Sequence, residues 1–252
     1  MGSALLKGWR ANKLKSIIVV EPQPSADIKK LAKAKAITLL AAPSQVKVKI
    51  DTCVVAIKPQ ILKGEAPALA AIAGKALMIS IAAGTSIAAL RAAWGAKTRI
   101  VRAMPNTPGA IGRGITGLYA AKGVSATDRK KADALLGALG QTVWVKSEEL
   151  IDSVTALSGS GPAYVFHLVE AMTAAGVAAG LAAAEAEKLA RATVAGAGAL
   201  LDADKSGAAE LRVAVTSPGG TTEAALKVLM PELTGLMTRA IAAAKRRAEE
   251  LR

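Results

Sequence analysis

The sequence predicts an α/β domain built on a doubly wound, mostly parallel sheet, followed by a domain made only of helices. Short apolar, β-branched runs alternate with helical segments as far as Ser147, which is the pattern of parallel strands joined by helices. From Glu148 onward only helical periodicity remains, without a strand-like run. We therefore expect two domains, 1–147 and 148–252.

Local signals define the elements of the first domain. The run Ser16–Val20 is typical of a buried parallel strand and stops at Glu21-Pro22. Later strands stop in the same way, at Lys58-Pro59 and at Ala83-Gly84. Strands are expected at 16–20, 37–40, 52–57, 76–82, 98–103, 115–120 and 142–145, and helices at 1–13, 29–36, 67–74, 87–94 and 128–139.

The second domain is rich in alanine and glycine, which allows its helices to approach one another closely. Gly196 and Gly198 are the expected crossing points, and Pro162 suits the first helical turn after a loop at 158–162. An intertwined homodimer is the expected assembly. Helices are expected at 149–157, 163–179, 183–201, 222–229 and 231–251, with a short one ending at Leu211.

Composition limits the classes of function. The one cysteine, Cys53, excludes a disulfide framework and suits a reducing cytoplasm. The formal net charge of +14 would attract nucleic acid or an anionic membrane, but no aromatic residues lie between the groups of lysines and arginines to stack bases. No secretory leader or membrane-spanning segment is evident. We expect a cytoplasmic protein that binds neither nucleic acid nor membrane.

The first candidate site is the edge of the sheet at which its parallel strands end. Doubly wound sheets bind ligands beyond the carboxyl ends of their strands. The loops at Glu21, Lys58-Pro59, Ala82–Gly84 and Pro105-Asn106 all follow predicted strands and fall at that edge. A small ligand or a nucleotide would bind there.

The second candidate site is the turn within Val215–Ala225. Gly219 and Gly220 free the backbone for positive φ, Pro218 fixes its entry, and Thr221 or Thr222 can cap the helix that follows. Amides at a helix start, together with a hydroxyl, can hold a small carboxylate or a polarised C=N bond. An ordinary turn between helices explains the same residues, and this stretch alone does not decide between the two.

Three other side chains invite a catalytic interpretation. His167 is the chain's one histidine, a residue type that often acts as a general acid or base, but we interpret it, like Tyr164, as packing on a helix face or in a dimer interface. Cys53 is interpreted as a small core residue of a strand rather than a nucleophile. Neither a cluster of metal ligands nor a nucleophile–base pair is visible, so no metal is expected.

Five segments together resemble those of the pyrroline-5-carboxylate reductases. They are Ala56–Gln60, Ser80–Gly84, Arg102–Pro108, Leu157–Tyr164 and Val215–Thr222, in the family's order and approximate spacing. The resemblance implies a Rossmann-like nucleotide-binding domain followed by an all-α dimerisation domain. It also implies an enzyme that uses NADPH or NADH to reduce the C=N bond of 1-pyrroline-5-carboxylate, giving L-proline.

The resemblance also implies roles for individual residues. Thr222 would place its hydroxyl near the imine nitrogen, which makes it the candidate catalytic residue. Asn106 would lie near the nicotinamide, and Glu148 matches a position that the family places near the cofactor. The candidate substrate-binding residues are Ser217, Gly219, Gly220, Thr221 and Thr222; the candidate cofactor-binding residues are Met1, Gly2, Glu21, Ala56, Ile57, Lys58, Pro59, Ile81, Ala82, Ala83, Asn106 and Glu148.

The chain departs from the family pattern mainly at its start. The family's first strand and Gly-x-Gly-x-x-Gly loop would precede Met1, so we expect a sheet lacking that strand, in a sequence that starts at an internal methionine of a longer reading frame. Glu21 stands where the adenosine ribose should lie and favours NAD, because a carboxylate repels a 2′-phosphate. Lys205 occupies a region where the family often carries an acid.

Two alternatives compete with an active reductase. One is a catalytically silent, helical-dimer homologue that cannot bind cofactor because the glycine loop is missing. The other is a dehydrogenase of β-hydroxy acids, which would need a lysine base in the second domain. Lys188 is the mid-helix candidate for that base, and no motif surrounds it.

Overall fold

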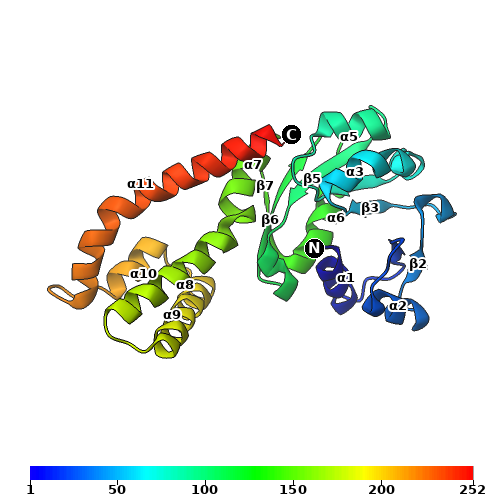
Figure 1. The fold of residues 1–252 in the computed structure, drawn as a ribbon. Coiled ribbons are helices and arrows are strands. Elements are labelled where there is room, and N and C mark those ends of the chain that lie inside the picture. The colour runs from blue at the N-terminus through cyan, green and yellow to red at the C-terminus, as the bar shows by residue number, and fades with distance from the viewer. Residues whose placement is uncertain (252) are drawn as a thin grey trace. The chain divides into compact units, whose positions relative to one another are not determined.

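The computed structural model describes residues 1–251, except for the side chains of Pro59 and Lys63. The chain forms two compact units (Figure 1). Unit 1 comprises Met1–Gly159 together with the C-terminal residues from Lys245 onward, and unit 2 comprises Ser160–Ala244. The predicted domain boundary after Ser147 stays a prediction.

Unit 1 alternates strands and helices as the sequence predicts. Its strands are β1 (Ile18–Val20), β2 (Thr38–Leu40), β3 (Thr52–Val55), β4 (Leu77–Ser80), β5 (Arg99–Met104), β6 (Gly114–Ala120) and β7 (Gly140–Trp144). Its helices are α1 (Gly2–Ala11), α2 (Ala26–Lys33), α3 (Pro59–Glu65), α4 (Ala70–Ala73), α5 (Ile87–Trp94), α6 (Ala126–Leu136) and α7 (Leu150–Val154). Helix α3 was not predicted, because Pro59 was interpreted as the end of a strand, whereas it starts a helix.

The strands form two sheets. Strands β1 and β2 pair in parallel, while the other sheet has the order β3-β4-β5-β6-β7 and is parallel apart from the antiparallel β5–β6 pair. Among the described residues, each of β1 and β3 pairs with a strand on one edge only. In the described part of the chain, the predicted single sheet is therefore divided into two, because β1 and β3 do not pair.

Helix α1 joins these two sheets through neighbouring leucines. Leu5 is fully buried with residues of β4, β5 and β6, such as Leu77. Leu6 is buried with Ile17 and Ile37, beside β1 and β2. Consecutive side chains on a helix project about 100° apart, so a single helix can pack into two cores.

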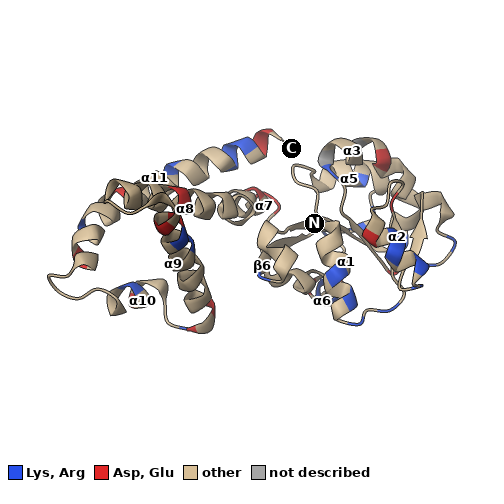
Figure 2. Ribbon diagram, turned by 60° about the horizontal axis from the view of Figure 1, so that its bottom comes forward, with Lys and Arg blue, Asp and Glu red and all other residues tan. Residues whose placement is uncertain are grey.

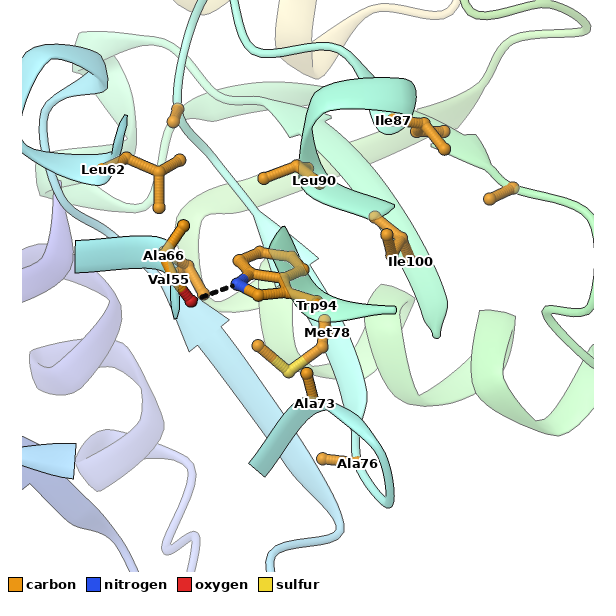
Figure 3. Packing of buried hydrophobic residues seen from close by; sticks show 12 residues of the cluster. Val55, Leu62, Ala66, Ala73, Ala76, Met78, Ile87, Leu90, Trp94 and Ile100 are labelled. Carbon is orange, nitrogen blue, oxygen red and sulfur yellow. Dashed lines mark hydrogen bonds between the residues drawn. The ribbon is translucent and has the colours of Figure 1, made fainter. Parts of the chain in front are cut away.

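A second core covers the other side of the larger sheet. The indole of Trp94 packs among apolar side chains that include Leu62 and Leu90, and its Nε1 donates to the carbonyl of Ala66 at 2.9 Å (Figure 3). Burial of an indole is favourable when its polar N–H also finds an acceptor. This bond secures the segment between α3 and α4 against α5.

Unit 2 consists of helices α8 (Gly161–Ala178), α9 (Ala183–Ala203), α10 (Ala208–Ala214) and most of α11 (Thr221–Glu250). Helices α8 and α9 pack together where a Cβ on Gly176 would lie 3.1 Å from that of Ala186. Within its described residues, Ala186 and Ala190 are the buried apolar side chains. Large ones such as Phe166 and Val228 are about two-thirds exposed.

Two predictions for the helical region are wrong. The expected loop at 158–162 is largely helical, because Thr155 and Ser158 donate to carbonyls four residues back and a π-helical turn, Thr155–Gly159, leads almost directly into α8. Helix α11 continues through Pro231, which removes only one backbone donor. Within the described chain nothing lies within 4 Å of a Cβ added at Gly196 or Gly198, so a close crossing of helices at these glycines stays a prediction.

Charged residues are spread over the chain. Figure 2 shows Lys and Arg on α1, α2 and the end of α11, interspersed with uncharged residues. Among the described residues, no helix combines the length and apolar character needed to cross a membrane.

The packing of α1 predicts different effects for its two leucines. We expect Leu5→Ala to lower the free energy of unfolding of the whole unit by about 2–5 kcal/mol, because it opens a cavity in a fully buried core. Leu6→Ala should chiefly increase amide hydrogen exchange in β1 and β2. Lys7→Ala, at an exposed position of the same helix, is the matched control. Equal exchange in both sheets of the Leu6 variant would contradict the prediction.

Candidate functional site

The carboxyl ends of β3, β4 and β5 bring three predicted cofactor segments to one edge of the sheet. These strands are parallel neighbours, so the residues that follow them, starting with Ala56, Ile81 and Pro105, leave the sheet on the same side. The Ile81 amide donates to the Val55 carbonyl at 3.1 Å, which holds the first two exits together. Such an edge is the usual ligand site of this class of sheet.

The N-terminus of α1 lies at this edge. A Cβ on Gly2 would be 3.3 Å from the Cβ of Ala56, so glycine lets the helix start close to the end of β3. Met1 occupies the cap position without a side-chain cap, and the first-turn amides of a helix have no acceptor within the helix. Together with the helix dipole, these amides favour a bound anion such as a phosphate.

The segment after β4 turns sharply at Gly84. This residue has φ of 66°, in the region that glycine adopts without strain. A Cβ added there would also lie 2.7 Å from the carbonyl oxygen of Leu251. The position therefore requires glycine on two grounds, and it shapes the loop that carries Ala82 and Ala83.

Glu148 holds two parts of this edge together. Its Oε1 accepts from Nη1 of Arg102 on β5 and from the amide of Ile87 at the start of α5, each at 2.7 Å. The Arg102 side chain is 3% exposed and that of Glu148 is 20% exposed. Removing a guanidinium from water is costly unless a carboxylate faces it, so this ion pair explains how Arg102 is accommodated inside the sheet.

Asn106 shapes the turn between β5 and β6. Its Oδ1 accepts from the amide of Ile115 at 3.0 Å, and a Cβ on Gly114 would lie 2.9 Å from that oxygen. The side chain is thus committed to the backbone of the following strand. This contact fixes the position of Asn106 at the sheet edge.

The remaining predicted cofactor residues lie at other strand ends. Glu21 follows β1 in the two-stranded sheet, where its amide donates to the Leu40 carbonyl and its Oε1 accepts from the Gln23 amide at 3.0 Å. Ile57 packs against the core around Trp94, and the exposed Lys58 caps α3. The side chain of Pro59 lies outside the described part of the chain.

The predicted substrate turn lies in unit 2 and directly precedes α11. Gly219 has φ of 70°, and its amide donates to Oε2 of Glu223 at 2.6 Å. The Gly220 amide donates to the Ser217 carbonyl at 3.0 Å. Thr222 is half-buried in the first turn of α11, whereas Ser217 and Thr221 are exposed. The turn therefore presents a helix N-terminus beside the Gly219 amide, which already binds a carboxylate.

Two residues of these sites were missed in the sequence analysis. Arg102 interrupts an apolar strand, and a charge in such a run is the available signal that it has a buried partner. Glu223 gives no comparable signal, since an acid in the first turn of a helix is common. Its contact with Gly219 depends on the shape of the turn.

The other side chains with possible chemistry are separate from these two sites. Burial raises the pKa of the Cys53 thiol to about 11, so the thiol is protonated and a poor nucleophile at neutral pH. His167 is exposed on α8, with Nδ1 2.9 Å from Oε2 of Glu170. Lys188 is exposed on α9, and Lys205 is exposed between α9 and α10. Among the described residues, no three His, Cys, Asp or Glu side chains gather in a way that could hold a metal ion.

A mixed sheet with helices, a helix N-terminus at its strand-end edge and a separate helical unit define a Rossmann-like nucleotide-binding architecture. Residues 148–251 match the family model described as pyrroline-5-carboxylate reductase dimerisation. That match covers less than half of the chain, but 40% identity to a curated relative over the whole chain shows that the chain belongs to the pyrroline-5-carboxylate reductase family.

Similarity to individual members extends over the whole chain. The pyrroline-5-carboxylate reductase of Pseudomonas aeruginosa is 40% identical over 254 residues, covering 100% of this chain and 93% of the relative. That of Mycobacterium tuberculosis is 37% identical, covering 100% and 94%.

Solved structures show the same fold. A pyrroline-5-carboxylate reductase from Coxiella burnetii aligns with a TM-score of 0.90 and 36% identity, over 99% of this chain and 94% of that one. A pyrroline carboxylate reductase from Plasmodium falciparum, solved with NADP bound, aligns with a TM-score of 0.80 and 26% identity, over 100% and 94%.

The Gly84 turn supplies a direct test of the strand-end edge. We expect Gly84→Ala to lower the free energy of unfolding by about 1–2 kcal/mol, because alanine is strained at positive φ, and to weaken NADH binding measured by fluorescence titration. Gly74→Ala is the matched control, since Gly74 has φ of −63° and no atom closer than 3.9 Å to an added Cβ. Equal behaviour of the two variants would contradict the assigned role of Gly84.

Proposed function

We infer that this protein is a pyrroline-5-carboxylate reductase, an NAD(P)H-dependent oxidoreductase that acts on a CH–NH group in the last step of proline biosynthesis. The observation that carries the inference is the sequence identity of 36–42% with reductases of this family. The alignments at 40% and 36% identity cover the entire chain. In the reaction a hydride is added to the imine carbon of 1-pyrroline-5-carboxylate and a proton to its nitrogen, giving L-proline. NAD(P)H supplies the hydride.

The strand-end edge of unit 1 is the proposed cofactor site. The first turn of α1, at Met1 and Gly2, would bind a phosphate through backbone amides and the helix dipole. Ala56 and the residues 57–59 after β3, together with 81–83 after β4, would line the bound nucleotide. These segments fit such a ligand because small residues and glycine let the backbone approach it, as the Gly2–Ala56 contact illustrates. Asn106 would lie toward the nicotinamide.

The turn before α11 is the proposed substrate site. The first-turn amides at Thr221 and Thr222 have no intrahelical acceptor and favour a carboxylate. The Gly219 amide holds the Glu223 carboxylate at 2.6 Å, which supports the capacity of this turn to bind a carboxylate group. A substrate carboxylate would take the place of Glu223 there, while Ser217 and Gly220 shape the turn. The Thr222 hydroxyl would hydrogen-bond the imine nitrogen as it gains its proton.

The protein acts as a homodimer, and we propose that unit 2 supplies the interface. Its described residues bury little by themselves and expose large apolar side chains on α8, α9 and α11, a pattern that marks a protein–protein interface. The match to the dimerisation model spans these helices. A cytoplasmic location is our proposal, on the basis of the single cysteine and the biosynthetic reaction.

The role of Thr222 is tested by steady-state oxidation of NADH with pyrroline-5-carboxylate. We expect Thr222→Val to lower kcat about 10²-fold, because a hydrogen-bond donor at the developing charge is lost, and Thr222→Ser to retain most of it. Thr127→Val, at an exposed position of α6, is the control. A Val variant as active as the wild type would remove Thr222 from the mechanism. Absence of turnover in the wild type, alongside absent NADH and NADPH binding, would favour the silent-homologue alternative.

Glu21 is proposed to set the preference between the two nicotinamide cofactors. Its carboxylate is fixed at the end of β1 by the Gln23 amide, where it would accept from ribose hydroxyls and repel a 2′-phosphate. We expect the wild type to prefer NADH in kcat/KM, and Glu21→Ser to raise kcat/KM for NADPH about tenfold. Glu65→Ser, at an exposed acid of α3, is the control. A wild type that prefers NADPH would contradict this role.

A further inference from the structure

The bond between Glu148 and the start of α5 links residues that lie far apart in the sequence. Ile87 is the first residue of α5, and its amide donates to Glu148 Oε1 across a separation of 61 positions. The Ser86 hydroxyl caps the same helix by accepting from the Ala89 amide at 3.2 Å. The N-terminus of α5 is therefore held by one local acceptor and one distant carboxylate.

The segment 81–86 is anchored at both ends as a result. Its beginning is fixed by β4, where Ser80 is buried beside Arg102 in the β4–β5 register. Its end is fixed by Glu148 at Ile87. Ile81 and Ala82, next to β4, pack against the two cores of the larger sheet. Ala83, which is exposed, and Gly84, with its positive φ, lack such packing, so the second half of the segment depends most on the anchor at Ile87.

Arg102 in turn fixes the Glu148 carboxylate. The same Oε1 accepts from Nη1 of Arg102 and from the Ile87 amide, so moving one partner disturbs the other. A guanidinium that is 3% exposed leaves a large uncompensated charge if its carboxylate is removed. Helix α7, which follows Glu148, also lies against β5 and β6 and limits where this side chain can go.

We propose that Glu148, clamped by Arg102, is a positioning residue that sets the conformation of segment 81–86 and thereby the affinity of unit 1 for the nicotinamide cofactor. It acts through the amide of Ile87 and transfers no proton in the reaction. The link to cofactor affinity rests on the proposed function, whereas the control of segment 81–86 does not.

Hydrogen exchange of the cofactor-free protein tests the control of the segment directly. Glu148→Ala should increase amide exchange in residues 82–87 about tenfold, because the acceptor at Ile87 is lost. Glu148→Gln keeps an acceptor at this position but not the charge facing Arg102, so a smaller increase is expected. Glu149→Gln, the exposed neighbouring acid, serves as the control. Unchanged exchange in residues 82–87 of the Ala variant overturns the proposal.

The double variant Arg102→Met/Glu148→Gln separates positioning from a general loss of structure. It removes both charges while retaining an acceptor for Ile87, so exchange in residues 82–87 should return toward the wild-type rate. The double variant also provides the test if Glu148→Ala fails to fold. Exchange that stays as fast as in Glu148→Gln alone overturns the role assigned to Arg102.

Cofactor titration and kinetics then test whether Glu148 sets the affinity for the cofactor. For Glu148→Ala we expect the dissociation constant for NADH to rise about tenfold, with an unaltered pH profile of the reaction. A fall in kcat with loss of one limb of the pH profile, at unchanged NADH affinity, would identify Glu148 as a proton-transfer group and overturn the proposal. Failure of the wild type to reduce pyrroline-5-carboxylate would refute the proposed function alone, because the exchange result is independent of it.

Discussion

The packing of α1 into two cores is the constraint on which the architecture of unit 1 depends. Leu5 joins the core of the five-stranded sheet and Leu6 joins the core of the two-stranded sheet. Among the described residues no strand pairs β1 with β3, so apolar packing, rather than backbone hydrogen bonding, relates the two sheets. The same helix starts beside Ala56, which places its positive end at the strand-end edge. The association of the two sheets and the proposed anion site thus depend on the same helix.

Polar contacts then fix the loops at the strand-end edge of this packed unit. Arg102 lies within a buried strand, and the carboxylate that compensates it comes from the segment after β7 and also holds the start of α5. Asn106 similarly ties the exit of β5 to β6. Each contact fixes a loop at the strand-end edge to a different element of the sheet. In the loop after β4, Ala83 and Gly84 depend on such a distant anchor, because their own side chains bury little apolar surface.

Unit 2 buries little apolar surface within the single chain, in contrast to unit 1. Its helices carry many alanines, and its described residues include only two buried apolar side chains, Ala186 and Ala190. Exposed leucines, valines and Phe166 lie on several of the helices, so burial of apolar surface must come largely from association. The close approach of Gly176 to Ala186 shows how α8 and α9 pack with little side-chain volume. Dimerisation would therefore bury apolar surface that this unit leaves exposed in the single chain, in line with its match to the family's dimerisation model.

Local sequence determined most strands and helices apart from α3, the bounds of α5, the glycine turns and the family, because periodicity, caps and motifs act over a few residues. It also proposed two candidate sites, which stay predictions. It did not reveal the continuous α11, the helical segment at 158–162, the Glu223–Gly219 bond or the partner of Arg102. Those features depend on groups brought together by packing: Glu148 and Ile87 are 61 positions apart, and only the folded sheet places a carboxylate between a buried guanidinium and a helix N-terminus.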